Sequence, residues 1–175
     1  MHANTTSSKM LNLEVSHTVG ATKLRLFLLA FGLFFCLAWQ PATAKVVEMD
    51  NFKDWSVYRD DSGAERLCYM SSVPKKLRGD YDRNNRGETR VFVTHFGKSD
   101  RNVVSVLAGY KYQKQSDVTF NIDGNETVLF TQDNRAYSFN EADDTTLVTR
   151  MKRGNKLVVT GISSRGNKTI DEYSL

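Results

Sequence analysis

Short runs of β-branched and aromatic residues recur between turn-forming residues at roughly ten-residue spacing from residue 54 onward. The clearest run is DVTFNIDGNETVLF, residues 117–130, in which Val118, Phe120 and Ile122 alternate with polar residues. That alternation indicates a strand with one buried and one solvated face. The Asp-Gly pair that follows tolerates positive φ, which a tight hairpin turn requires. The pattern predicts a mainly β protein, a single antiparallel β-sandwich of about eight strands with one short helix.

The remaining strands are expected between comparable turn signals. They are Asp54–Asp60, Glu65–Ser72, Thr89–Phe96, Val103–Tyr112, Arg135–Phe139, Lys156–Ser164 and Lys168–Leu175. Arg165-Gly166-Asn167 is expected to form a second hairpin turn between the last two strands.

One helix is expected over residues 140–155, NEADDTTLVTRMKRGN. Acidic residues gather at its N-terminal end and Lys152 and Arg153 at the other, which complements the helix dipole. Gly154 is suited to a left-handed C-terminal cap. We interpret the acidic cluster as helix capping and expect no metal ion there.

The first 44 residues have the features of a secretory signal peptide. Lys23 and Arg25 precede the uncharged apolar run Leu26–Trp39, and small residues at Ala42 and Ala44 suit cleavage after Ala44. The apolar run is shorter than the ~20 residues that a membrane-spanning helix needs. We therefore expect a cleaved signal peptide over 1–44, one domain over 45–175 and no transmembrane segment after cleavage. Translation could start at Met1 or at Met10.

The charge balance gives no support to nucleic-acid binding. The whole chain has a formal net charge of +4, but part of that excess lies in the leader. Nucleic-acid binding requires a basic face rather than a small excess of basic residues.

Cys68 and His95 are the only cysteine and histidine after the leader, and they fall on neighbouring expected strands. A hydrolase or transferase that uses Cys68 and His95 is therefore the alternative to a non-catalytic protein. Both residues lie inside apolar strands rather than on a sharp turn that would expose a nucleophile, which favours a structural role. We expect Cys68 to be an unpaired, largely buried thiol, and we expect no cofactor and no metal.

The segment Lys75–Arg90, KKLRGDYDRNNRGETR, is the most basic surface segment. Its candidate binding residues are Lys75, Lys76, Arg78, Arg83 and Arg86. They could meet an anionic surface such as phospholipid, lipopolysaccharide or host glycan, and the alternative is a solvated connection of mixed charge. Three tyrosines that we expect to be exposed, Tyr81, Tyr110 and Tyr112, are consistent with a binding role.

The ordered set of motifs resembles the invasion-associated locus B family. The motifs are DWSVY, RLCYMSSVPK, RVFVTHF, RNVVSVLAGY, VTFNIDG, LFT, NRAYSF, LVTRMKRG and VTGISSRGNKTIDEYSL, in collinear order from Trp55 to Leu175. The resemblance implies an exported bacterial β-sandwich domain, periplasmic, outer-membrane associated or secreted, linked in some pathogens to invasion of host cells. It implies no catalytic site and no cofactor.

The resemblance also concerns the partner of Cys68. Similar proteins continue past the position of Leu175 to a terminal cysteine, and Cys68 matches the cysteine that would pair with it. Either that bridge has been lost or the sequence is shortened. The function that follows is a non-catalytic binding domain, whose partner is an envelope or host-surface component, either protein or anionic glycan or lipid.

Overall fold

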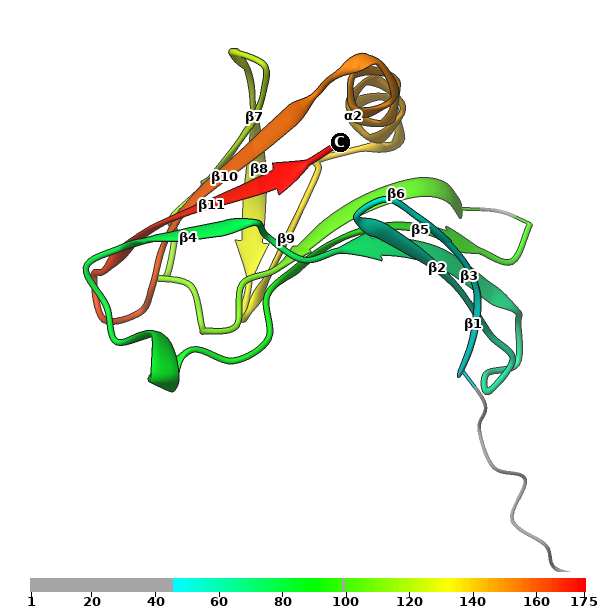
Figure 1. The fold of residues 1–175 in the computed structure, drawn as a ribbon, viewed down its shortest axis with the longest axis horizontal. Helices are drawn as coiled ribbons and strands as arrows, with labels where there is room; N and C mark the ends of the chain where they lie inside the picture. Colours follow the sequence, from blue (N-terminus) through cyan, green and yellow to red (C-terminus); the bar gives the residue numbers. More distant parts are fainter. Residues whose placement is uncertain (1–45, 99) are drawn as a thin grey trace, which may run out of the picture. The chain divides into compact units, whose positions relative to one another are not determined.

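A computed structural model describes residues 46–98 and 100–175 (Figure 1). The expected signal peptide, with Met10 and Cys36, lies outside the described residues. The described residues form eleven strands, a 3-10 turn and one helix. Their bounds are β1 Val46–Phe52, β2 Trp55–Asp60, β3 Leu67–Ser72, β4 Lys76–Gly79, η1 Arg83–Asn85, β5 Arg90–Phe96, β6 Asp100–Leu107, β7 Val118–Ile122, β8 Asn125–Gln132, β9 Arg135–Tyr137, α2 Glu141–Arg153, β10 Lys156–Ile162 and β11 Lys168–Ser174.

All eleven strands are hydrogen-bonded in one antiparallel order, β1-β2-β3-β5-β6-β9-β8-β7-β10-β11-β4. Strand β8 joins two halves, because its first residues pair with β7 and its last three pair with β9. We refer to β1, β2, β3, β5, β6 and β9 as the N-terminal half-sheet. Strands β4, β7, β10 and β11 form the C-terminal half-sheet (Figure 1). The two layers expected of a sandwich are thus two halves of one continuous sheet.

The mainly β class is confirmed, but the count of about eight strands was too low. The strands that sequence patterning missed include β1 and β4, which are the two edges of the sheet. Nearly every side chain of Val46–Phe52 is exposed, and Lys76–Gly79 has only four residues. An edge strand without a buried face carries no hydrophobic alternation for sequence analysis to detect.

Both half-sheets contribute to a single hydrophobic core. Val91, Val104 and Val106 come from the N-terminal half-sheet, and Phe120 and Leu157 from the C-terminal half-sheet, each at most 1% exposed. The alternation predicted for residues 118–122 is confirmed, because the three apolar side chains are buried and the two polar ones are not. The two predicted hairpin turns also form.

The two ends of helix α2 are set by a side-chain cap at the N-terminus and by close packing at the C-terminus. Asn140 caps its N-terminus by accepting a 3.0 Å hydrogen bond from the Asp143 backbone N–H. Gly154 at the C-terminus has φ −84°, so the expected left-handed cap is wrong. A Cβ at Gly154 would lie 2.7 Å from Ile122 and 3.0 Å from Leu175. Close packing against these side chains, and not backbone conformation, therefore favours glycine here. No helix within the described residues is long and apolar enough to cross a membrane.

Asp144 attaches α2 to the N-terminal half-sheet. Asp144 is 7% exposed, and its Oδ1 accepts hydrogen bonds from the Val104 backbone N–H at 2.8 Å and from the Ser138 hydroxyl. Burial raises the pKa of Asp144, and these hydrogen bonds oppose the rise. The acidic cluster that we interpreted as helix capping therefore contains one residue that connects helix and sheet.

We expect Asp144→Ala to lower the free energy of unfolding by about 2 kcal/mol, because the buried Val104 N–H loses its partner. Urea denaturation measures the change. Thr145→Ala, one position along and exposed, is the matched control and should change stability by less than about 0.5 kcal/mol. Equal losses in both variants would contradict this role for Asp144.

Candidate functional site

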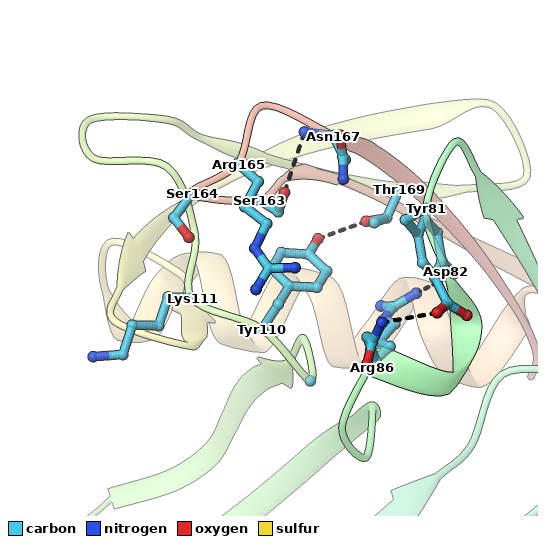
Figure 2. Close-up of a pocket in the computed structure, with 12 residues that line it drawn as sticks. Tyr81, Asp82, Arg86, Tyr110, Lys111, Ser163, Ser164, Arg165, Asn167 and Thr169 are labelled. Atoms are coloured by element: carbon cyan, nitrogen blue, oxygen red, sulfur yellow. Dashed lines mark hydrogen bonds between the residues drawn. The ribbon is translucent and has the colours of Figure 1, made fainter.

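Three connections between strands enclose a cavity of about 350 Å³, which we call the loop cavity (Figure 2). One wall comes from the β4–β5 connection, one from the β6–β7 connection and one from the β10–β11 turn and the start of β11. The lining residues are Tyr81, Asp82, Asn85, Arg86, Gly109, Tyr110, Lys111, Ser163, Ser164, Arg165, Asn167 and Thr169. Most of them are polar, so the cavity suits a ligand that forms hydrogen bonds.

A buried ion pair fixes the first wall. The Arg86 guanidinium donates two parallel hydrogen bonds to the Asp171 carboxylate, at 2.7 and 2.5 Å. The two side chains are only 4% and 3% exposed. This bidentate geometry is the strongest form of the arginine–carboxylate interaction. The pair therefore attaches the β4–β5 connection to β11.

Arg86 satisfies its other donors within the same cluster. Its Nε donates to the Ala108 carbonyl at 2.9 Å, and one terminal nitrogen donates to the Tyr81 hydroxyl at 2.8 Å. The guanidinium also lies 5.3 Å from the centre of the Tyr81 ring and 5.1 Å from that of Tyr110. Burial alone would lower the pKa of Arg86, but the hydrogen bonds and charge of Asp171 outweigh it and raise the pKa. Arg86 is thus a permanently charged, fully engaged group at the cavity wall.

Tyr110 lies at the centre of the loop cavity, and its hydroxyl is 2.5 Å from that of Thr169 (Figure 2). Its ring meets Tyr112 edge-on, with 5.3 Å between the centres. Burial raises the pKa of Tyr110, and so it stays neutral at physiological pH. A Cβ at Gly161 would lie 2.7 Å from the Tyr112 ring and 3.0 Å from the Tyr110 hydroxyl. A glycine at 161 therefore leaves room for both tyrosines.

The free positive charge of the loop cavity comes from Lys111 and Arg165. The Lys111 Nζ lies 3.2 Å from Asp133 Oδ1, and both side chains are more than half exposed. Arg165 forms no ion pair with any described residue, and it extends from the β10–β11 turn toward Tyr110 (Figure 2). The lining carboxylate of Asp82 is occupied by the Asn84 backbone N–H and the Asn85 amide. The cavity therefore presents one unpaired and one weakly paired cation.

The five basic residues expected to form a binding loop separate into three environments. Lys75 pairs with Asp54, while Lys76 and Arg78 pair with Glu172 along the edge strand β4. Arg83 is exposed on η1. The Arg86 side chain is buried, so its inclusion in an exposed basic surface was wrong. Its basic neighbours in the sequence give no sign that it pairs with Asp171, which lies 85 residues away.

The expectation that the three tyrosines are exposed is wrong. Tyr81 and Tyr110 are half-buried and line the loop cavity, and Tyr112 is 6% exposed and belongs to the core. Sequence reasoning did not single out Lys111 or Arg165. Arg165 was recognised only as part of a hairpin turn, and a turn residue carries no local sign of the connection that faces it.

Cys68 and His95 are directly opposite each other on β3 and β5, as their neighbouring strands allowed. They line a hollow of about 610 Å³ together with charged residues such as Arg66 and Arg101. Cys68 is half-buried rather than largely buried, because the core face of β3 opens into this hollow beyond Met70. It forms no disulfide with any described residue.

The arrangement around His95 does not provide a nucleophile and a base in contact. His95 sits at an irregularity in the β5–β6 pairing, and its Nδ1 accepts a 3.0 Å hydrogen bond from the Asn102 backbone N–H. Within the described ranges, no hydrogen bond joins the Cys68 sulfur to the imidazole. Activation of a thiol by histidine needs that contact. The same ranges contain no group of three or more metal-binding side chains.

These features define a class: a mainly β domain with one docked helix, whose loops enclose a polar cavity with two cations at its mouth. The family model described as Invasion associated locus B (IalB) protein matches residues 55–175, and the chain belongs to this family. The resemblance drawn from the ordered motifs is thereby confirmed. No curated protein and no solved structure gives a match.

We expect Arg86→Ala to lower the free energy of unfolding by about 3–5 kcal/mol, because it leaves the Asp171 carboxylate buried without a partner. Replacing both residues, as Arg86→Met with Asp171→Leu, should recover much of that loss. Urea denaturation compares the variants, with exposed Arg83→Ala as the control. A single variant as stable as the parent chain would show that the pair contributes nothing.

For the Cys68–His95 pair, we expect His95→Ala to leave the pH dependence of Cys68 alkylation unchanged, since no hydrogen bond joins the described Cys68 thiol and His95 imidazole. Iodoacetamide labelling of the folded protein from pH 6 to about 9 measures it. A large loss of labelling near neutral pH in the His95 variant would instead support the Cys68/His95 enzyme.

Proposed function

We propose that this member of the invasion-associated locus B family is an exported, non-catalytic binding protein. Its loop cavity recognises an anionic group, such as a phosphate, sulfate or carboxylate, on an envelope or host-surface component. The observation that carries this proposal is Arg165, which has no acidic partner among the described residues and lines a polar cavity of about 350 Å³ that Lys111 also lines.

The charge balance of the cavity supports an anionic ligand. Three cations line the cavity, Arg86, Lys111 and Arg165, against one lining carboxylate, Asp82. Asp171 pairs with Arg86 and Asp133 with Lys111 from outside the lining, so Arg165 is the lining cation without an acidic partner among the described residues. The Ser164 hydroxyl and the Asn167 amide line the same cavity as further hydrogen-bonding groups. A cation with a planar fork of donors is well suited to an oxyanion.

Two further observations support the absence of catalysis and the export. The family is not a known enzyme family, and His95 makes no contact that would activate Cys68. The basic, apolar and small-residue order of residues 23–44 favours export and cleavage. Periplasmic, outer-membrane associated and secreted forms all agree with this proposal.

The cations along β4 are a weaker candidate for the same role. Lys75, Lys76 and Arg78 are each more than half exposed, but each has an acidic partner. Exposed pairs of this kind are weak and can exchange partners in salt solution. We therefore assign the principal contact to the loop cavity and a supporting one to β4.

The test uses the processed protein recovered from bacteria that express the full chain, with an N-terminus at Lys45 expected by mass spectrometry. Lys111→Glu with Arg165→Glu should weaken binding to phosphatidylglycerol vesicles or lipopolysaccharide at least tenfold, since each basic residue near an anionic surface contributes ~1 kcal/mol. Vesicles of phosphatidylcholine alone should bind neither form.

Arg101→Glu with Lys114→Glu is the matched control, because it changes the net charge equally at two exposed cations outside the loop cavity. Equal losses in both double variants would show a non-specific charge effect. Binding that survives the cavity variant but not reversal of Lys75, Lys76 and Arg78 would move the site to β4.

A further inference from the structure

The outer face of the N-terminal half-sheet, opposite the hydrophobic core, carries a third hollow, of about 630 Å³. Alternation along the strands directs Val91 and Val93 to the core and Phe92 to this outer face. The paired residues of the neighbouring strands continue the same row, with Ser71, Ser105 and Tyr137. We call this hollow the aromatic groove, defined by Tyr58, Tyr69, Phe92, Tyr137, Arg90 and Arg135.

Aromatic rings follow one another across the groove. Tyr58 and Tyr69 stack with 5.0 Å between centres, and Tyr69 lies 5.9 Å from Phe92. Tyr137 lies 5.8 Å from Phe130 on β8. These rings are half-buried and take no part in the core cluster. A half-buried aromatic row on a solvated sheet face is typical of a recognition surface.

Polar groups lie between the rings at the base of the groove. Thr94 is 7% and Ser105 5% exposed, and neither hydroxyl forms a hydrogen bond with any described residue. The Arg135 guanidinium lies 5.2 Å from the centre of the Phe92 ring, again without an acidic partner in the described part of the chain. These three residues line the hollow, so their polar groups are available to hydrogen-bond a ligand that lies in it.

The charges of the groove cancel. Its charged lining residues are Asp60, Glu88, Arg90 and Arg135, two of each sign, and Arg90 donates to Glu88 at 2.5 Å. A polyanion would meet Asp60 and Glu88, and an entirely apolar partner would cover Thr94, Ser105 and Arg135 without hydrogen bonds. The ligand therefore needs flat apolar faces together with uncharged hydrogen-bonding groups.

We propose that the aromatic groove binds a neutral oligosaccharide of pyranose units. The C–H faces of the sugar rings would pack on Tyr69, Phe92 and Tyr137, and the sugar hydroxyls would supply both donors and acceptors. The Arg135 guanidinium would donate to them, while the Thr94 and Ser105 hydroxyls can do either. This is a second site, formed by strands that do not line the loop cavity and with a lining whose charges cancel.

The test is isothermal titration calorimetry on the processed protein with cellohexaose, maltohexaose and the β-1,4-linked N-acetylglucosamine hexamer. At least one should bind, with an affinity that changes little between about 0.1 and 0.5 M NaCl because no net charge is involved. Tyr69→Ala should weaken it about tenfold. Arg135→Gln, which keeps the side chain long and polar, should also weaken sugar binding. It provides an independent test of the groove if Tyr69→Ala does not fold.

Phe52→Ala is the matched control, because it removes a phenyl ring that is 60% exposed and outside the groove, and its binding should equal that of the parent chain. Failure of all three sugars to bind would overturn the proposal. Binding of heparin alone, or dimerisation or vesicle binding that Tyr69→Ala abolishes, would also overturn it. A protein that binds a hexasaccharide but no anionic vesicle would support the groove and refute the loop cavity.

Discussion

The Arg86–Asp171 pair is the interaction on which the arrangement of the loop cavity depends. It joins the β4–β5 connection, which crosses from one half-sheet to the other, to the middle of β11. Removing either charge would leave the other buried without its charged partner, which is far more costly than replacing both. The same guanidinium contacts Tyr81, Tyr110 and Ala108, so one side chain sets the separation of two cavity walls.

Close backbone packing supports this arrangement. Gly87 donates its N–H to the Gly109 carbonyl at 2.9 Å, and Gly109 has φ +74°. A Cβ at Gly109 would lie 2.3 Å from the Gly87 carbonyl oxygen. Glycine at 109 thus meets two requirements at once, a left-handed backbone and direct contact between two connections. The contact between Gly87 and Gly109, which leaves no room for a side chain at residue 109, thus fixes the backbone next to Tyr110.

Sequence reasoning succeeded where the signal is local. The alternating run at 118–122, its Asp-Gly turn and the helix with its charge order all depend on residues close in the chain, and all three are present. It failed where the deciding partner is distant. Arg86 looked like a surface cation because its neighbours are basic, and the two sheet edges were missed because exposed strands have no buried face. The cations of the loop cavity come from connections whose meeting depends on the whole strand order.

Cys68 and Met70 lie on the same face of β3 but in different surroundings. Met70 packs against the core, whereas Cys68, two residues earlier on the same face, borders a hollow with His95 and several charged residues. An apolar sequence around a cysteine therefore does not establish burial, because burial depends on whether the opposite layer extends that far. Helix α2 covers the core face near Met70, where Val148 and Met151 line a hollow with it. Neither lines the Cys68 hollow. The half-buried state of Cys68 thus follows from the reach of α2 and not from the residues beside it in the chain.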